Sequence, residues 1–369
     1  VDAGPLTLDG VVNHWLRTWR VPQSPLVSGD NPVTLRSLLN HTAGLNVHGF
    51  PGFGPAAEIP SAAGILRGEG NSDPVAAEAT PGAAFRYSGG GYTVMQQLVE
   101  DVTDTDFASF ANETVLRPLG MNHSGFFQPL SPGQRDRSAT GYWDVDRPVD
   151  GGAHTYPQLA AAGLWTTPTD LARFMLSVYE AHDDGGDHEV LSSDTLAEML
   201  EASANEWGLG PEVSADGTRI SHGGANEGFR CWMTMSLVTG DGVVVMTNSD
   251  GGGQLSHEMA LSVAREYAWP QFRPEVKRVV ALSDEQYRDV TGIYTAEGWG
   301  SATVVYQQGL LLARPTWAEE GELLPETDSD FFVRDTAMPV RFIREDGEVV
   351  AAQFGSWRFE RTGSSDEGD

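Results

Sequence analysis

The chain has 369 residues, of which 40% are hydrophobic and 20% are charged, the proportions of a globular protein. A chain of this length can bury a large core and has room for a main domain and a smaller one. No apolar run approaches the roughly 20 residues that a membrane-spanning helix needs. The formal net charge of -29 argues against a nucleic-acid partner, because an acidic surface repels the phosphate backbone.

Arginine supplies almost all of the positive charge. Lys277 is the single lysine among 23 basic residues, which face 52 acidic ones. An excess of carboxylates with almost no lysine resembles the proteins of salt-adapted organisms, in which concentrated salt screens the self-repulsion. We therefore expect an acidic, halophilic protein.

Cysteine and histidine give no sign of a disulfide or a metal site. Cys231 is the only cysteine, and its place in an apolar run predicts an unreactive buried thiol. The nine histidines lack ligand spacing and there is no phosphate-binding loop, so no metal and no cofactor are expected. The first residues show no basic-then-apolar export leader. Compartment and oligomeric state stay open.

Local patterns predict mainly helices in the first half of the chain. Residues 7–22 predict a short helix and a loop. Thr34 is the expected N-cap of a compact helix that ends near Gly44. Residues 46–84 are rich in Gly, Pro and Ala without a period, which is typical of a lid or an active-site flank. Further helices are predicted after residues 87–92, over 107–115, from Pro168 with Thr167 as N-cap, from Ser192 or Ser193, and over about 254–268 with an apolar face of Leu255, Met259, Val263 and Tyr267.

Strands dominate the rest. Residues 230–237 and 243–247, joined by a Gly/Asp turn, predict a hairpin of a mostly buried sheet, with His222-Gly223-Gly224 just ahead of it. Glycines there would let a substrate approach the backbone closely. From Leu282 onward, short alternating runs without a helical period predict an antiparallel β module. The expected domain boundary lies near 272–280, and residues 363–369 are expected to be disordered.

Five motifs occur in a fixed order: residues 38–45 (LLNHTAGL), 87–92 (YSGGGY), 116–121 (LRPLGM), 163–171 (GLWTTPTDL) and 222–224 (HGG). Together they resemble the serine β-lactamase-like hydrolases, a family of class C β-lactamases, DD-peptidases, D-aminopeptidases and esterases. The resemblance implies an α+β domain over residues 1–272, an antiparallel sheet flanked by helices plus a helical subdomain, incomplete at its N-terminus. Residues 280–362 resemble the lipocalin-like β domain that some members append, with a small antiparallel β fold.

The resemblance also implies roles for particular residues. Tyr87 would relay protons, which requires a nearby cation because a phenol with a pKa of about 10 is protonated at neutral pH. His222 takes the first position of the family's Lys-Thr-Gly triplet, so Tyr87 and His222 are the expected catalytic pair, facing one another across a single cleft. Ala225 would offer its backbone N–H to an oxyanion. The expected substrate-binding residues are Gly89, Gly223, Gly224 and Ala225.

Two features depart from the family. The nucleophile motif Ser-x-x-Lys is absent, because Lys277 has Pro274 three positions before it. The simplest interpretation is a truncated chain without its nucleophile helix, which alone would be inactive. Gly89 replaces an asparagine that would bind the substrate's amide carbonyl, so a small-molecule ester or a peptide is favoured over a β-lactam. The hypothesis is a serine hydrolase acting through an acyl-enzyme; the alternative is a non-catalytic homologue or fragment that binds a ligand without turnover.

Each candidate also has a structural interpretation. Tyr87 would be a packed tyrosine with a satisfied hydroxyl, and His222 a histidine at a strand end. Ser88 is expected to cap a helix rather than act as a nucleophile. His41 is expected to bond the backbone of the turn at Gly44. Polar residues that either line the site or lie on the surface are Asn226, Glu227 and Arg230.

Overall fold

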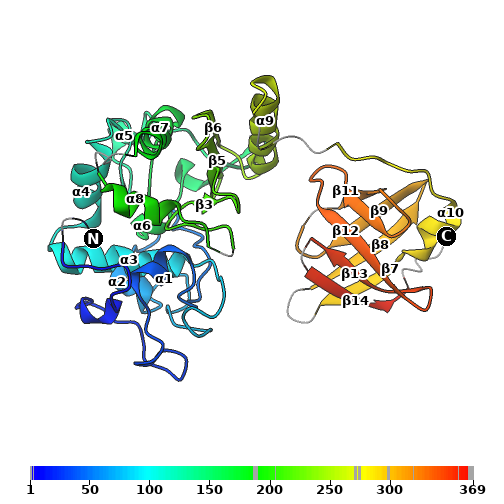
Figure 1. The fold of residues 1–369 in the computed structure, drawn as a ribbon, viewed down its shortest axis with the longest axis horizontal. Helices are drawn as coiled ribbons and strands as arrows, with labels where there is room; N and C mark the ends of the chain where they lie inside the picture. The colour runs from blue at the N-terminus through cyan, green and yellow to red at the C-terminus, as the bar shows by residue number, and fades with distance from the viewer. Residues whose placement is uncertain are drawn as a thin grey trace. The chain divides into compact units, whose positions relative to one another are not determined.

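The computed structural model describes residues 2, 4–185, 190–203, 205–269, 272, 276–296, 300–318, 320–355 and 357–364. The chain divides into two compact units, Val1–Arg273 and Pro274–Asp369 (Figure 1). The first unit mixes helices with a small sheet, and the second is almost entirely β. Among the described residues, no helix has both the length and the apolar character that crossing a bilayer would require.

Helices are the commonest regular structure in the described part of the first unit. Thr34 caps α1 through a bond from the Ser37 N–H, and Thr167 caps α7 through a bond from the Asp170 N–H, as the sequence predicted. The helical elements are η1 (Val12–His14), α1 (Leu35–Leu39), α2 (Ala62–Leu66), α3 (Gly89–Thr103), α4 (Phe107–Ala111), η2 (Asn112–Leu116), α5 (Pro132–Arg135), η3 (Asp150–Gly152), α6 (Leu159–Ala162), α7 (Pro168–Asp184), α8 (Ser193–Leu200) and α9 (Gly252–Glu266).

The sheet of the first unit has the strand order β3-β4-β5-β6 and is antiparallel throughout. Its strands are β3 (Glu212–Val213), β4 (Arg219–Asn226), β5 (Phe229–Ser236) and β6 (Gly242–Thr247), while β1 (Tyr142–Asp144) and β2 (Arg147–Pro148) form a separate pair. The predicted hairpin is β5-β6. The His-Gly-Gly triplet lies ahead of this hairpin, as expected. It is part of a strand, β4, which pairs with β5 from Arg219↔Ser236 to Asn226↔Phe229.

Helices cover both faces of this sheet. Met175 and Val178 of α7 and Leu196 of α8 share one buried cluster with Ile220 of β4 and Met235 of β5. Alternate residues of a strand point to opposite faces, so Trp232 of β5 faces away from that cluster. The Trp232 ring lies 5.1 Å from the His257 ring of α9, which places α9 on the second face. The sheet is therefore the middle layer of three, as Figure 1 shows.

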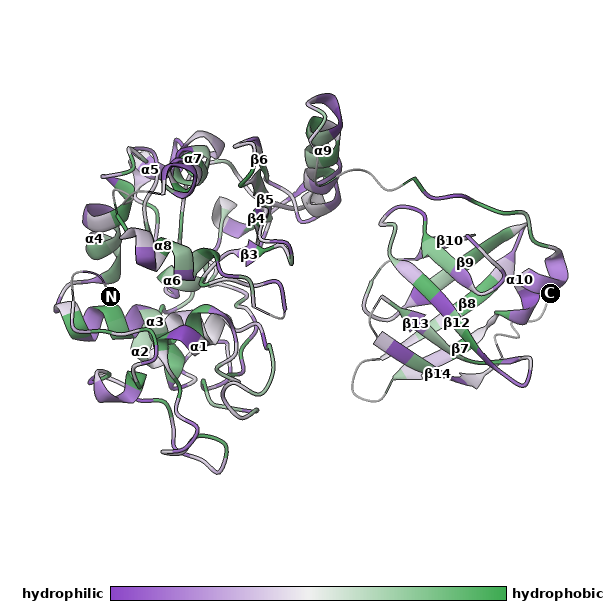
Figure 2. Ribbon diagram, viewed as in Figure 1, coloured by the Kyte–Doolittle hydropathy of each residue, from purple (hydrophilic) through white to green (hydrophobic). Residues whose placement is uncertain are grey.

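The face that α9 buries differs from the face that the sequence predicted. Leu255 and Met259 are 52% and 47% exposed and Tyr267 is 70% exposed, although they were expected to pack inward. Figure 2 shows hydrophobic stretches along this helix. Small residues make the contact with the sheet because they let the helix approach closely; a Cβ on Gly252 would lie 1.7 Å from Thr247 Oγ1. The buried positions are Gly252, Ser256, Ala260 and Ala264.

The second unit is an antiparallel barrel. Within the described residues eight strands follow one another around it, and β14 pairs with β7 to close it. Its interior is filled by large side chains, among them Tyr294, Phe331 and Phe342. The strands are β7 (Gly292–Ala296), β8 (Gly300–Gln307), β9 (Leu310–Pro315), β10 (Gly321–Pro325), β11 (Asp330–Val333), β12 (Pro339–Glu345), β13 (Glu348–Phe354) and β14 (Trp357–Gly363).

Two expectations for this unit were wrong in detail. A helix, α10 (Asp284–Asp289), precedes the barrel in a stretch where no helix was expected. Ser283 and Gln286 form a capping box at its start, which explains why so short a helix forms. Residue Gly363, expected in a disordered tail, is the last residue of β14, and the tail from residue 365 lies outside the described residues.

Candidate active site

Ser88 occupies the N-cap of α3. Its hydroxyl accepts the N–H of Gly91 at 2.9 Å and donates to the carbonyl of Asn46 at 2.6 Å. The residue is 3% exposed. Ser88 is therefore a helix cap, as the sequence predicted, and its oxygen is committed to two backbone groups.

His41 lies just after α1, and its backbone is in the left-handed region, with φ at 58°. Its Nδ1 accepts the N–H of Ser88 at 3.0 Å, so the expectation that it bonds the turn at Gly44 was wrong. The imidazole stacks on the ring of Tyr87 at a centroid distance of 4.1 Å. Burial, with further contributions from His222 and His48, lowers the pKa of His41 to about 3, so the ring is neutral.

Trp207 connects the two predicted catalytic residues. Its ring lies edge-on to Tyr87 at 5.5 Å, to His41 at 5.0 Å and to His222 at 5.7 Å. Tyr87 and His222 thus belong to one group of packed rings, as the hypothesis of a single cleft requires. We call His41, Tyr87, Tyr92, Trp207 and His222 the aromatic cluster; Tyr92 joins it through a 5.1 Å stack on His41. Trp207 was missed in the sequence because residues 201–218 have no periodic pattern.

The environment of Tyr87 is the opposite of the one expected. A cation was expected to lower its pKa, but burial and the negative charge of Glu212 raise the pKa instead. Burial also lowers the pKa of His222, which Glu212 and the carbonyl of Gly223 only partly offset. The Tyr87 hydroxyl has no hydrogen-bond partner in the described part of the chain. The cluster therefore holds a neutral phenol with its hydroxyl available to a ligand.

Strand β4 has an edge without a strand partner beside the aromatic cluster, in the part of the chain that the structure describes. Strand β3 pairs only with Ile220 and Ser221 of β4, so residues 222–226 have no strand partner on that side among the described residues. Gly223 and Ala225 are exposed there, whereas Gly224 turns toward β5. A Cβ on Gly224 would lie 2.6 Å from the Cys231 sulfur, so a side chain at this position would force the thiol to move. Burial raises the pKa of that thiol, in keeping with the expected unreactive cysteine.

Gly89 is not brought to this open strand. It is buried at the start of α3, and its N–H donates to the carbonyl of His48 at 3.0 Å. Three other candidates bond protein groups instead of facing a hollow. Asn226 donates to the carbonyl of Ala162. Glu227 accepts a hydrogen bond from the indole N–H of Trp143, and Arg230 forms an ion pair with Asp250.

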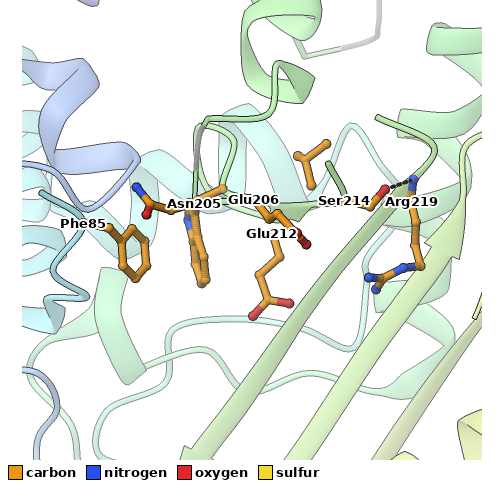
Figure 3. Close-up of a pocket in the computed structure, with 8 residues that line it drawn as sticks. Phe85, Asn205, Glu206, Glu212, Ser214 and Arg219 are labelled. Atoms are coloured by element: carbon orange, nitrogen blue, oxygen red, sulfur yellow. Dashed lines mark hydrogen bonds between the residues drawn. The ribbon is translucent and has the colours of Figure 1, made fainter. Parts of the chain in front are cut away.

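A hollow of about 400 Å³ opens next to Trp207 (Figure 3). Phe85 and Trp207 form one wall, with ring centroids 5.4 Å apart. Glu212 and Arg219 lie on the other side. In the part of the chain that the structure describes, no three His, Cys, Asp or Glu side chains gather so as to hold a metal ion.

The fold and this site can be set against known proteins. A sequence model of the Beta-lactamase family matches residues 1–268. The chain belongs to the beta-lactamase family. Among its relatives, Penicillin-binding protein 4* of Bacillus subtilis (strain 168) is 24% identical over 380 residues, 96% of this chain and 80% of that protein. Other curated relatives are longer, and the chain spans about half of their length.

Solved structures share the fold of this beta-lactamase family member. The octameric penicillin-binding protein homologue from Pyrococcus abyssi matches with a TM-score of 0.60 and 20% identity, over 96% of this chain and 82% of that one. The D-amino acid amidase from Ochrobactrum anthropi SV3, complexed with L-phenylalanine amide, matches with a TM-score of 0.53 and 20% identity, over 71% and 78%. At this identity the likeness establishes the fold alone.

Proposed function

We propose that this chain carries the substrate-binding half of a serine hydrolase site for an ester or a D-amino-acid peptide. The observation that carries the proposal is the packing of Tyr87 and His222 around Trp207 beside the open edge of β4. An extended substrate can add to such an edge through main-chain hydrogen bonds. The names of relatives, D-amino acid amidase and putative D-alanyl-D-alanine carboxypeptidase, support the D-amino-acid part of the proposal.

Turnover by an acyl-enzyme needs an activated nucleophile, and the Ser-x-x-Lys motif that would supply it does not occur in this sequence. Ser88 is bonded to Asn46 and Gly91, and the single lysine, Lys277, does not follow it in a Ser-x-x-Lys motif. We therefore expect no covalent adduct when the chain meets p-nitrophenyl acetate and its intact mass is measured. An acetyl group located on Ser88 would contradict this expectation.

A nucleophile supplied in solution tests whether the other residues of the proposed site accelerate the reaction. Sites that lack a catalytic residue can retain rate enhancement from binding and from oxyanion donors, about a thousandfold in well-studied hydrolases. We expect the chain to accelerate the attack of hydroxylamine on a D-alanine ester, with saturation in ester. The Tyr87→Phe variant should lose most of this acceleration, whereas Tyr267→Phe, on the exposed end of α9, should keep it.

A second candidate is a binding protein without turnover. The state of the aromatic cluster favours it, because Tyr87 stays protonated and cannot accept a proton, and a pKa of about 3 makes the His41 imidazole a weak base. Binding of the ester by calorimetry together with no acceleration of hydroxylamine attack would select this candidate over the hydrolase.

For the second unit, we propose a lipocalin-like module, since an eight-stranded up-and-down barrel is the architecture of lipocalins.

A further inference from the structure

The aromatic cluster and the hollow beside it differ in charge. Burial lowers the pKa of His41 and His222 and raises the pKa of Tyr87 and Tyr92, so these four side chains are neutral near pH 7. Glu212 is the carboxylate whose charge acts on both Tyr87 and His222. The charge that a ligand meets at this end of the cluster is therefore negative.

Glu212 is held in place with one oxygen left over. Its backbone forms a bridge with Trp207, which fixes the carboxylate beside the cluster. The Ser221 hydroxyl donates to Glu212 Oε2 at 2.8 Å. Among the described residues, Oε1 accepts no hydrogen bond and the carboxylate forms no ion pair. A carboxylate oriented by one bond and open on the other oxygen is ready to accept a charged donor.

Arg219 does not neutralise this carboxylate directly. Its Nη1 donates to the Ser221 hydroxyl at 3.1 Å, and its guanidinium lies over the ring of Phe272 at 5.7 Å. Figure 3 shows the Glu212 and Arg219 side chains as separate groups among the residues that line the hollow. The serine hydroxyl therefore stands between the two charges.

The walls of the hollow suit a cation. The rings of Phe85 and Trp207 lie 5.4 Å apart and line it opposite Glu212. Aromatic faces attract ammonium groups, and the attraction is stronger where water is excluded. A space of about 400 Å³ accommodates an amino acid residue. Aromatic rings and an open carboxylate together recognise an amino group.

We propose that the hollow formed by Glu212, Trp207 and Phe85 binds the free ammonium group of the substrate, so that this chain prefers peptides, amides or esters with an unblocked amino terminus. This inference rests on the proposed function, because it places the amino end of the substrate next to Tyr87 and His222. It predicts that acylation of the substrate's amino group weakens binding. Removal of the Glu212 charge should abolish the preference.

The test compares three small probes by calorimetry at pH 6.5: D-alanine amide, N-acetyl-D-alanine amide and N-acetyl-D-alanine. We expect the unblocked amide to bind about tenfold or more tightly than its acetylated form, the effect of one charge-assisted bond. In Glu212→Gln the two amides should bind equally. Glu258→Gln, which removes the same charge from the exposed surface of α9, should keep the preference, and thermal unfolding should show that both variants remain folded.

Each other outcome overturns a definite statement. Equal binding of the two amides by the unaltered chain would refute the ammonium site and leave the proposed function standing. Tighter binding of N-acetyl-D-alanine would instead assign the hollow to a carboxylate held by Arg219, and would also refute the ammonium site. Failure of all three probes to bind, in a folded protein, would count against the proposed function itself.

Discussion

The imidazole of His41 lies stacked on the phenol ring of Tyr87, with centroids 4.1 Å apart, and its Nδ1 accepts the backbone N–H of Ser88 at 3.0 Å. One side chain thus contacts both Ser88, the N-cap of α3, and Tyr87, the residue before it. Because the histidine comes from the segment after α1, it joins two parts of the chain that are 47 positions apart.

Removing this acceptor should destabilise the first unit. In His41→Leu the buried N–H of Ser88 loses its partner, which costs about 1–3 kcal/mol. Urea unfolding followed by tryptophan fluorescence measures the change. The matched control is His14→Leu, because His14 lies on the surface helix η1 and has no comparable bond among the described residues; equal stability of His41→Leu and the parent chain would contradict the prediction.

The same histidine should make stability depend on pH. Burial holds the pKa of His41 at about 3, below the ordinary value of 6.5, so the unfolded chain takes up a proton that the folded chain refuses. Its contribution is complete above pH 6.5 and falls as the pH drops toward 3. Between pH 7 and pH 5 the free energy of unfolding should decrease by about 2 kcal/mol from this residue. His41→Leu should flatten that part of the pH profile, and an unchanged slope would refute the assignment.

Loss of the Ser88 cap should affect folding and not chemistry. Ser88→Ala removes the acceptor of the Gly91 N–H, which costs about 1 kcal/mol of stability. Thermal unfolding checks this value. The hydroxylamine reaction with a bound ester should proceed as in the parent chain, since the hydroxyl is turned toward Asn46; a lost reaction in a folded variant would restore Ser88 as a chemical group.

The two sides of α9 should respond in opposite ways to substitution. Leu255→Ser alters an exposed side chain and should change the free energy of unfolding by less than about 0.5 kcal/mol. Ala260→Leu inserts a large side chain where the helix packs closely on the sheet and should cost about 1–3 kcal/mol. Urea unfolding of both variants checks the pair. The reverse order would mean that α9 buries the face that the sequence indicated.

Salt should stabilise the fold. A net charge of -29 produces repulsion within the folded chain, and salt screens it as the Debye length falls to about 3 Å at 1 M. The thermal midpoint should rise with potassium chloride up to about that concentration. A midpoint that does not respond to salt would show that the acidic residues are spaced widely enough to avoid repulsion.

Local chemistry explains which elements were predictable. α7 followed from Thr167, Pro168 and Asp170, because an N-cap, a proline at the first position and an acid near the start all act within one helical turn. In α9 the helical period was recognised, but a period cannot tell which of two apolar faces meets the sheet. Ala260 and Ala264 were overlooked there because small residues signal close approach only once the partner surface is known.

The candidate site was predictable only where a motif carried it. Tyr87 and His222 stood in family motifs, and the structure brings both to one cluster. Trp207 and Glu212 lie in a stretch without a motif, and their positions result from a bridge between them and from contacts with distant segments. The negative charge of Glu212 that acts on Tyr87 could not be predicted either, since the charge around a buried phenol depends on the three-dimensional neighbourhood.

The closure of the barrel has a practical consequence for engineering. Because the C-terminal part of β14 pairs with β7, from Glu360↔Thr295 to Gly363↔Ile293, the two ends of the second unit's sheet lie next to one another. A short linker between them, with a new opening at the exposed turn between β8 and β9, would give a circularly permuted module with every strand pair retained. Such a permutant would move the point of attachment without disturbing the packed interior.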